Sequence, residues 1–307
     1  MKLTVVIPAG KNSELSVIES LKNQSEKPFQ VIVARGAQAS RNRNRGIEQA
    51  RGDFIAFVNS HSSFPSDWVF QIRRFFENYP SVDVVGGPQL TPPGSGFFEK
   101  ISGYALTSKF GAANVAGRYK KGKLNLNAGE TDITSSNLIC RRGVLAKVRF
   151  NENLWPGEDP KFICDAKASG FRVAYCPDIV GYNQRRGSSA GLMKQFFNYG
   201  KFRPRFSSVL KNPLFLIPGL FFLYVLFLVL FSVGNLSLTG NVIGGGLIGS
   251  VLVIPLIAYI FLALLFGIID GFRNSDLRGV LVLPFVYPMI HLSYGAGLVL
   301  GILRKFI

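Results

Sequence analysis

Charged residues are missing from one long part of this 307-residue sequence. Between Lys211 and Asp270 there is no Asp, Glu, Lys or Arg. A soluble domain does not leave so long a stretch uncharged, whereas a helix that crosses a bilayer needs about 20 apolar residues in a row. The sequence therefore changes character near residue 211, and residues 212–307 are predicted to form a membrane anchor.

The anchor is predicted to hold two or three transmembrane segments, at about residues 214–233, 243–269 and 280–303. Basic residues before the first segment place the preceding domain in the cytosol, which makes this a multi-pass protein of the cell membrane. The third segment is interrupted by Pro284 and Pro288. If it spans, Arg304 and Lys305 lie on the wrong side for the positive-inside rule, so either the rule is weakly broken or the segment is re-entrant.

Acidic residues and cysteines are also scarce. There are 18 Asp and Glu against 35 Lys and Arg, a net charge of +17, and most of this excess precedes Lys211. Such a surface either is merely solvated or attracts anionic lipid headgroups and phosphorylated substrates. The sequence has no aromatic-studded basic motif of a known nucleic-acid-binding module, so nucleic acid is not expected as a partner. The three cysteines form no CxxC pair, which argues against a zinc site and fits a reducing compartment.

The first 60 residues alternate between short apolar runs and helical periodicity. Buried strands are predicted at residues 3–7, 29–34 and 54–58, and a basic helix at residues 40–50. Strands of this kind, separated by helices, indicate an α/β fold with a Rossmann-like, mostly parallel sheet covered on both faces. Ligands bind beyond the carboxyl ends of such strands, so a site is expected in the loops at residues 8–12, 35–38 and 59–62.

The following part continues this pattern with helices predicted at residues 66–79 and 160–169 and strands at 82–85 and 136–140. Pro160 is expected at the first position of its helix. Residues 97–127 show no clear period and are predicted to be irregular, either a mobile lid or a plain surface excursion. Residues 190–206 mix aromatic and basic side chains and suit a helix lying at the membrane surface.

Three motifs carry a family resemblance. They are VVIP at residues 5–8, RNRGIEQARGDFIAFVNSH at 43–61 and WPGEDPKFICDAKASGFRV at 155–173. In this order and spacing they resemble the family 2 inverting glycosyltransferases, and most of all the exopolysaccharide-type enzymes with C-terminal membrane helices. The resemblance implies a GT-A catalytic domain over residues 1–205 that takes a nucleotide-sugar donor.

The same resemblance implies a divalent cation, Mn²⁺ or Mg²⁺, on the diphosphate of the donor. In the family an Asp-x-Asp or Asp-x-His triplet after the third strand holds it, because a hard cation neutralises the departing phosphates. The triplet of this chain is Asn59-Ser60-His61, which has lost the first carboxylate. A site with an imidazole favours Mn²⁺. The alternative for His61 is a loop residue bonded to backbone.

A second departure from the family lies at the end of the second strand. The family has an acidic residue there that reads the base or the ribose, and this chain has Ala34-Arg35-Gly36. Arg35, Arg41 and Arg43 are expected to bind the diphosphate instead, unless they are surface charges. Further nucleotide-sugar contacts are expected from three residues, Pro8, Ala9 and Asn137.

Asp159 is the predicted catalytic base, with Glu158 as the alternative. In the family, an acidic pair at the start of this helix supplies the base that deprotonates the acceptor hydroxyl. Inversion requires this carboxylate to lie on the face of the sugar opposite the leaving nucleotide. An Asp before Pro160 is also a common helix N-cap, and the two roles can coexist. The resemblance also places Gln184 and Arg186 beside the acceptor and the diphosphate of the donor.

Trp155 is expected to stack on a sugar or to pack in the core. We therefore expect a membrane-bound enzyme that transfers a sugar, with inversion, to a membrane-associated acceptor such as a polyprenyl-linked glycan. The alternative is a catalytically silent GT-A relative that binds a glycan, a lipid or a protein partner. Asn59 and Ala34 favour that alternative, whereas the retained Asp159 argues against it.

Overall fold

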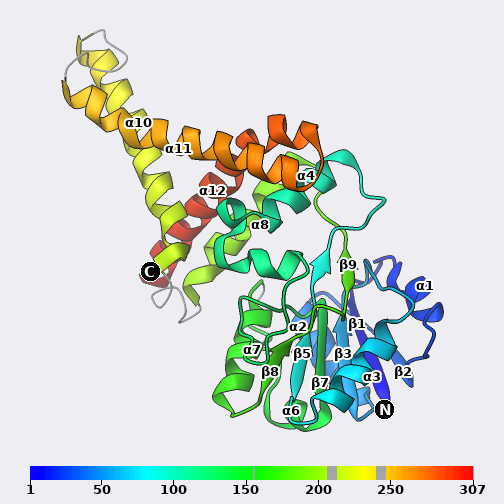
Figure 1. Ribbon diagram of the computed structural model, residues 1–307. Coiled ribbons are helices and arrows are strands. Elements are labelled where there is room, and N and C mark those ends of the chain that lie inside the picture. The colour runs from blue at the N-terminus through cyan, green and yellow to red at the C-terminus, as the bar shows by residue number, and fades with distance from the viewer. Residues whose placement is uncertain (155, 206–212, 240–246, 307) are drawn as a thin grey trace. The chain divides into compact units, whose positions relative to one another are not determined.

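The computed structural model describes residues 1–154, 156–205, 213–239 and 247–306. The chain forms two compact units (Figure 1). The sheet unit comprises Met1–Glu99 and Asn114–Arg185, and the helical unit comprises Lys100–Ala113 and Arg186–Ile307. The predicted domain limits, 1–205 and 212–307, stay predictions.

The sheet unit is built on a six-stranded sheet of order β2-β1-β3-β7-β5-β8. The strands are β1 (Leu3–Ala9), β2 (Gln30–Arg35), β3 (Phe54–Val58), β5 (Val84–Gly86), β7 (Asn137–Arg141) and β8 (Val173–Tyr175). Strand β1 pairs in parallel with β2 and β3, and β5 pairs in parallel with β8. Strand β7 runs antiparallel to β3 and β5. One edge of the sheet therefore collects the start of β7 and the carboxyl ends of the other strands, as a mostly parallel sheet was predicted to do.

A second, three-stranded sheet has the order β4-β9-β6. Its strands are β4 (Ser62–Ser63), β6 (Gln89–Leu90) and β9 (Gly181–Asn183). They follow β3, β5 and β8 in the chain after a few residues each. The small sheet therefore extends from the same edge at which the carboxyl ends collect (Figure 1).

Helices cover both faces of the large sheet, which confirms the predicted α/β fold. One apolar core joins the sheet to α2 (Ala39–Gln49), α6 (Arg142–Lys147) and α7 (Glu158–Ala168). The other joins it to α1 (Val17–Lys22) and α3 (Trp68–Asn78). Each fully buried Leu, Ile or Phe side chain contributes about 1.5–3 kcal/mol, so these two cores hold the strand ends in fixed positions.

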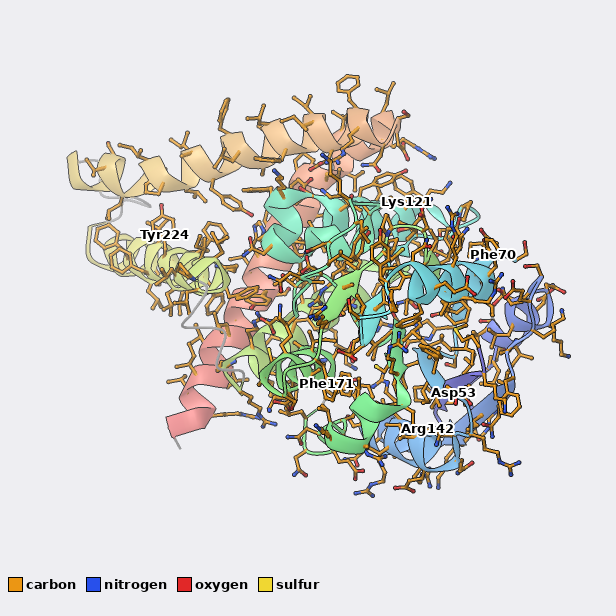
Figure 2. The ribbon with its side chains drawn as sticks, turned by 60° about the horizontal axis from the view of Figure 1, so that its bottom comes forward. Asp53, Phe70, Lys121, Arg142, Phe171 and Tyr224 are labelled. Carbon is orange, nitrogen blue, oxygen red and sulfur yellow. The ribbon has the colours of Figure 1, made fainter. Side chains whose placement is uncertain are left out.

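The opposite edge of the sheet is closed by a turn at Gly52. The backbone N–H of Arg142 donates to the carbonyl of Asp53 at 2.8 Å, and its guanidinium Nε donates to Gly52 at 2.9 Å. Figure 2 labels Arg142 and Asp53 on this edge. A Cβ at Gly52 would lie 2.5 Å from the carbonyl oxygen of Lys2, so the turn needs glycine.

Three local expectations differ from the structure. Strand β2 is an edge strand that exposes Val31 and Val33, so it is not buried on both faces. Helix α7 begins at Glu158, two residues before Pro160, because Gly157 takes a φ of 121° and turns the chain into the helix. Residues 97–119 are helical rather than irregular. They form α4 (Phe97–Thr107), α5 (Lys109–Ala112) and a 3-10 helix, Ala113–Tyr119.

The helical unit contains α8 (Ser189–Phe202), α10 (Ile217–Thr239), α11 (Leu247–Arg273) and α12 (Leu277–Phe306) together with α5 and most of α4. Among the residues described, three helices are long and apolar enough to cross a membrane, over Pro213–Val233, Ser250–Arg273 and Leu277–Arg304. The predicted segments 214–233, 243–269 and 280–303 fall on these helices, apart from residues 243–246, which lie outside the described part. Helix α12 is continuous although it contains Pro284 and Pro288.

Candidate active site

The sheet brings several predicted site residues to one edge. Pro8 and Ala9 end β1 opposite Ala34 and Arg35 of β2. Val58, the last residue of β3, pairs with Asn137, the first residue of β7. Asn59 and His61 follow directly in the turn after β3, where Asn59 is half-buried and His61 exposed. The parallel arrangement predicted from the strands therefore gathers these positions, and their contacts with a donor stay predictions.

Arg35 holds the loop that follows β1. Its guanidinium donates to the carbonyl oxygens of Gly10, Lys11 and Ser13 at 3.0–3.2 Å. The hydroxyl of Ser13 in turn accepts from the N–H of Gly10 at 3.1 Å. This arginine thus fixes the loop that leaves the carboxyl end of β1, and its predicted contact with a diphosphate stays a prediction.

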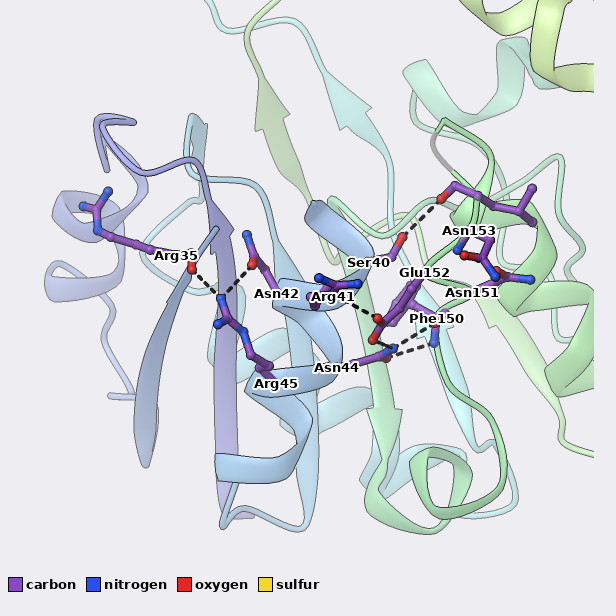
Figure 3. A network of polar contacts seen from close by, with 11 residues as sticks. Arg35, Ser40, Arg41, Asn42, Asn44, Arg45, Phe150, Asn151, Glu152 and Asn153 are labelled. Atoms are coloured by element: carbon purple, nitrogen blue, oxygen red, sulfur yellow. Dashed lines mark hydrogen bonds and ion pairs between the residues drawn. The ribbon is translucent and has the colours of Figure 1, made fainter. Parts of the chain in front are cut away.

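Asn42 joins the ends of the first two strands, a role that the sequence did not reveal. Its side-chain amide donates to the carbonyl oxygens of Ala9 and Gly36 at 3.1 and 3.0 Å. Its Oδ1 accepts from Arg45 at 3.0 Å, and Arg45 also donates to the carbonyl of Arg35 (Figure 3). A polar amide inside the predicted basic helix, residues 40–50, is the sequence signal that could have pointed to such a link.

The other side of α2 holds the segment that leads into α7. Ser40 donates to the carbonyl of Leu154 at 3.2 Å, and Arg41 pairs with Glu152 at 3.1 Å (Figure 3). Asn44 donates to Glu152 at 3.0 Å and exchanges two hydrogen bonds with the backbone of Phe150. The polar residues of this basic helix therefore position the chain before α7. Arg41 was expected at the diphosphate and in the structure contacts Glu152.

Arg43 and Glu158 form an ion pair of 2.8 Å whose side chains are only 5% and 8% exposed. The Arg43 guanidinium also lies over the Phe150 ring, and Glu158 accepts from the N–H of Gly157 at 3.0 Å. Burial raises the pKa of the Glu158 carboxyl, and the charge of Asp159 raises it further, although Arg43 acts in the opposite direction. Arg43 Nε is buried with no hydrogen-bond partner among the described residues. The Glu158 carboxylate is thus buried and bonded to Arg43 and to the N–H of Gly157.

Asp159 has a different environment. Its side chain is half-buried, and its Oδ1 accepts a hydrogen bond of 2.5 Å from the hydroxyl of Ser135. Ser135 is itself buried, in the turn that precedes β7 at the site edge. Gly157 is the residue before the helix, so Asp159 lies in the first turn of α7 and is not the N-cap. The accessible carboxylate of the pair is therefore Asp159, and it is held by a residue that the sequence did not single out.

Asn137 is fully buried. Its amide nitrogen donates to Ile179 at 2.6 Å and to Pro88 at 3.5 Å, and its Oδ1 accepts from the indole of Trp68 at 3.0 Å. These bonds tie β7 to α3 and to the loop after β8. The predicted contact with the donor stays a prediction, and in this conformation each polar atom of the amide has a protein partner.

The remaining predicted residues are spread over the chain. Gln184 is exposed in the sheet unit and donates to Glu99 at 3.2 Å, whereas Arg186 belongs to the helical unit. Trp155 lies outside the described residues. Arg185 lies between the two, in the same Gln/Arg segment that the resemblance places beside acceptor and diphosphate. It is buried, donates to Thr91 at 3.2 Å and to the carbonyl of Gln89, and lies over the Tyr119 ring.

The metal-binding position offers an amide and an imidazole, from Asn59 and His61, and no carboxylate. Within the described part of the chain, no three His, Cys, Asp or Glu side chains are grouped as metal ligands. Hard divalent cations take carboxylate oxygens by preference. These donors therefore do not fit a Mg²⁺ or Mn²⁺ ion held by the protein alone.

A shallow cavity of about 260 Å³ lies elsewhere in the sheet unit, between the start of α3 and the β8–β9 connection. It is lined by Pro65, Asp67, Gln71, Lys121, Asp178, Val180 and Tyr182. None of the predicted site residues lines it, so it gives no support to the predicted donor contacts.

Comparisons with known proteins agree with this fold. Residues 10–149 match the model of glycosyl transferase family 2. The mannosyltransferase PcManGT from Pyrobaculum calidifontis, in complex with GDP-Man and Mn²⁺, has a TM-score of 0.55 at 13% identity, over 99% of this chain and 88% of that one.

S. aureus TarS is also similar, with a TM-score of 0.45 at 16% identity, and the alignment covers 64% of this chain but only 38% of TarS. A comparison with curated proteins found no match. The predicted exopolysaccharide type stays a prediction. Residues 10–149 therefore form a glycosyl transferase family 2 domain, and the sheet unit has the GT-A fold.

Proposed function

We propose that this glycosyltransferase moves a sugar from a nucleotide-sugar donor to a membrane-associated acceptor, such as a polyprenyl-linked glycan, with inversion at the anomeric carbon. The observation that supports it most is the pair of environments at the start of α7. Asp159 is accessible and oriented by Ser135, while Glu158 is buried against Arg43. One accessible, oriented carboxylate at the site edge is what an inverting transfer requires of its base.

In the proposed reaction, Asp159 takes the proton of the acceptor hydroxyl as that oxygen attacks the anomeric carbon. The new bond forms on the face opposite the nucleotide, and the bond from the anomeric carbon to the diphosphate oxygen breaks. Its electron pair leaves with the nucleoside diphosphate, so the configuration inverts. Ser135 holds Oδ1 of Asp159, and we assign the proton transfer to the other carboxylate oxygen.

Glu158 and Arg43 act as positioning residues in this proposal. Their buried ion pair joins α2 to the first turn of α7 and so fixes the backbone that carries Asp159. A misplacement of the base by about 1 Å lowers the rate by about 100-fold. Accurate placement of Asp159 can therefore offset the free energy that it costs to bury the two charges of the ion pair.

The charge of the leaving diphosphate needs compensation, and we propose that the metal site of this chain is a degraded form of that in the family. A divalent cation that arrives with the donor would neutralise the phosphates, and Asn59 and His61 would be its protein neighbours, with Mn²⁺ preferred over Mg²⁺. The same-fold mannosyltransferase was solved with GDP-Man and Mn²⁺. Arg35 holds the loop after β1, where we propose that the donor binds.

Membrane location is the other part of the proposal. The apolar helices α10 and α11 have mean hydropathies of 2.8 and 2.9 over their candidate spans. We place them in the cell membrane with the sheet unit in the cytosol. The catalytic unit would then work at the headgroup plane, where a lipid-linked acceptor is concentrated and already oriented.

A donor screen tests this function. The full-length protein in detergent is titrated with a panel of nucleotide sugars, each with and without Mn²⁺, and saturable binding is measured by calorimetry. The donor that binds is then supplied with lipid-linked acceptors, and release of the nucleoside diphosphate is followed. We expect one donor class to bind and to turn over. Saturable binding without turnover on any acceptor would favour a catalytically silent relative, and the absence of any binding would contradict both.

A further inference from the structure

The ladder between β3 and β7 ends at the candidate active site. Val58 pairs with Asn137, and beyond this pair the chain leaves the ladder as two separate turns. Each turn is closed by its own backbone hydrogen bond. The N–H of Ser62 donates to the carbonyl of Asn59 at 3.2 Å, and the N–H of Asn137 donates to that of Thr134 at 3.3 Å. The two turns, residues 59–62 and 134–137, therefore need another link to fix their spacing.

These turns carry different parts of the site. The first contains the metal position, Asn59 and His61. The second contains Ser135, whose hydroxyl donates to Oδ1 of Asp159. In the proposed transfer, the base acts on one face of the sugar and the diphosphate leaves from the opposite face. The spacing of the two turns therefore bears on the alignment of the reacting groups.

A chain of side-chain hydrogen bonds connects the two turns. Ser62 donates to Oδ1 of Asn183 on β9 at 3.3 Å, and Nδ2 of Asn183 donates to Oε1 of Gln89 on β6 at 3.5 Å. Nε2 of Gln89 donates to the hydroxyl of Thr134, which lies 3.1 Å from the hydroxyl of Ser136. Asn183 is half-buried and the other four side chains are buried. Protein partners rather than water therefore satisfy these groups.

Gln89 is the middle member of this chain. Its amide donates through nitrogen and accepts through oxygen, so only one orientation satisfies both Asn183 and Thr134. The backbone of Gln89 is held as well, because its carbonyl oxygen accepts from the guanidinium of buried Arg185. Strand β9 pairs with both β4 and β6, so the backbone that carries these side chains is also continuous. The link therefore has one defined geometry.

We propose that Gln89 is a positioning residue of the sugar transfer. Through Asn183 on one side and Thr134 on the other, it sets the distance between the metal position and the turn that holds Asp159. A displacement of about 1 Å at a reacting group lowers the rate by about 100-fold, so loss of this link slows the reaction even when each turn keeps its own bond. The inference rests on the proposed function, and its test separates the two.

Gln24 provides a matched control in the same unit. It is also a buried glutamine. Its Nε2 donates to the carbonyl oxygens of Ser20 and Pro65 at 3.0 and 2.7 Å, and its Oε1 accepts from the N–H of Val69 at 3.1 Å. Methionine is an unbranched side chain that fills such a space without the amide. Gln24→Met and Gln89→Met thus remove comparable bonds, and only Gln89→Met cuts the link between the turns.

The kinetic test uses the full-length protein in detergent and the nucleotide sugar that the donor screen selects. We expect Gln89→Met to lower kcat by about 10- to 100-fold and Gln24→Met to change it by less than about 2-fold. In an Asp159→Asn background, Gln89→Met should lower kcat no further, because the base that it positions is gone. Equal losses in the two methionine variants, or a loss that adds to that of Asp159→Asn, would overturn the proposal.

Hydrogen exchange needs no substrate and so tests the link apart from the proposed function. Exchange is followed by mass spectrometry in the full-length wild type, Gln89→Met and Gln24→Met, over peptides that contain residues 59–63 and 133–137. We expect both turns to exchange faster in Gln89→Met, and the turn at 134–137 to be unchanged in Gln24→Met. Unchanged exchange of either turn in Gln89→Met would overturn the inference. Absence of turnover in the wild type would instead overturn the proposed function, and the positioning role with it, even if the link is present.

Discussion

The hydroxyl of Ser135 donates to Oδ1 of Asp159 at 2.5 Å, in the turn before β7. One residue away, Glu158 is sealed in an ion pair with Arg43. Two adjacent carboxylates on one helix turn therefore lie in different environments, one accessible and one buried. We propose that the accessible carboxylate, Asp159, acts on the acceptor and that the buried one, Glu158, holds the helix in place.

Removal of the Ser135 hydroxyl should slow turnover without weakening the binding of the nucleotide-sugar donor. A hydrogen bond to a charged group contributes about 1.5–3 kcal/mol, so Ser135→Ala is expected to lower kcat by about 10- to 100-fold if the bond is needed at the transition state. The donor Kd should stay unchanged, and Ser135→Thr should recover part of the rate. Steady-state kinetics with calorimetric donor binding decides this, and an unchanged kcat in Ser135→Ala would remove Ser135 from the mechanism.

The stability of the protein should depend on pH through Glu158. Its pKa is raised in the folded protein, chiefly by burial, so the folded state favours the protonated carboxyl. Its contribution to stability is then complete below the unfolded pKa, about 4.5, and is lost as the pH rises through the higher folded pKa. Relative to Glu158→Gln, the wild-type protein should therefore lose stability as the pH increases above this value. Chemical denaturation of both proteins across that range gives the difference, and a wild-type advantage that grows with pH would contradict the sign.

The metal position should respond to a restored carboxylate. If the site is a degraded form of that in the family, Asn59→Asp should bind Mn²⁺ at least about 10-fold more tightly than the wild-type protein, because the cation gains an anionic oxygen ligand. Calorimetric titration of both proteins, with and without donor, measures the change. Tight Mn²⁺ binding by the wild-type protein in the absence of donor would show that other residues hold the metal.

The contact between α8 and α12 should not tolerate a side chain at Gly297. Because its ideal Cβ would lie 2.0 Å from a backbone oxygen of α8, Gly297→Val should separate the helices and destabilise the helical unit by about 3 kcal/mol or more. Gly94 has no heavy atom within 4 Å of its ideal Cβ and serves as the matched control. Thermal unfolding in detergent compares the two variants, and equal melting temperatures would mean that the helices do not pack this closely.

The strands were the part most open to prediction from the sequence. Residues 54–58 form β3 as expected, because a short, unbroken apolar run that follows a glycine turn is typical of a buried strand. The start of α7 was misplaced because Gly157, not Asp159, makes the turn into the helix. Helices α4 and α5 were missed because Gly103 and Ser108 interrupt the apolar period, although Ser108 caps α5.

The contacts of the site residues were beyond prediction for a different reason. The bond between Ser135 and Asp159 and the pair between Arg43 and Glu158 join residues 24 and 115 positions apart. A single sequence shows which residues are polar and not which partners they meet. The basic character of α2 was evident and was assigned to phosphate binding, whereas the structure shows Arg41 and Arg43 paired with Glu152 and Glu158. The predicted roles of Asp159, Asn137 and His61 toward substrate stay predictions.

The central claim is that Asp159 is the base of a sugar transfer, and its direct test is the turnover of Asp159→Asn in the full-length protein. General base catalysis contributes about 10²- to 10⁴-fold, so the variant should lose that much of kcat while its donor Kd changes by less than about 2-fold. The amide can still accept from Ser135, so the local fold should be kept, which circular dichroism and thermal unfolding verify. Turnover that equals the wild-type rate, with the donor bound normally, would contradict the account.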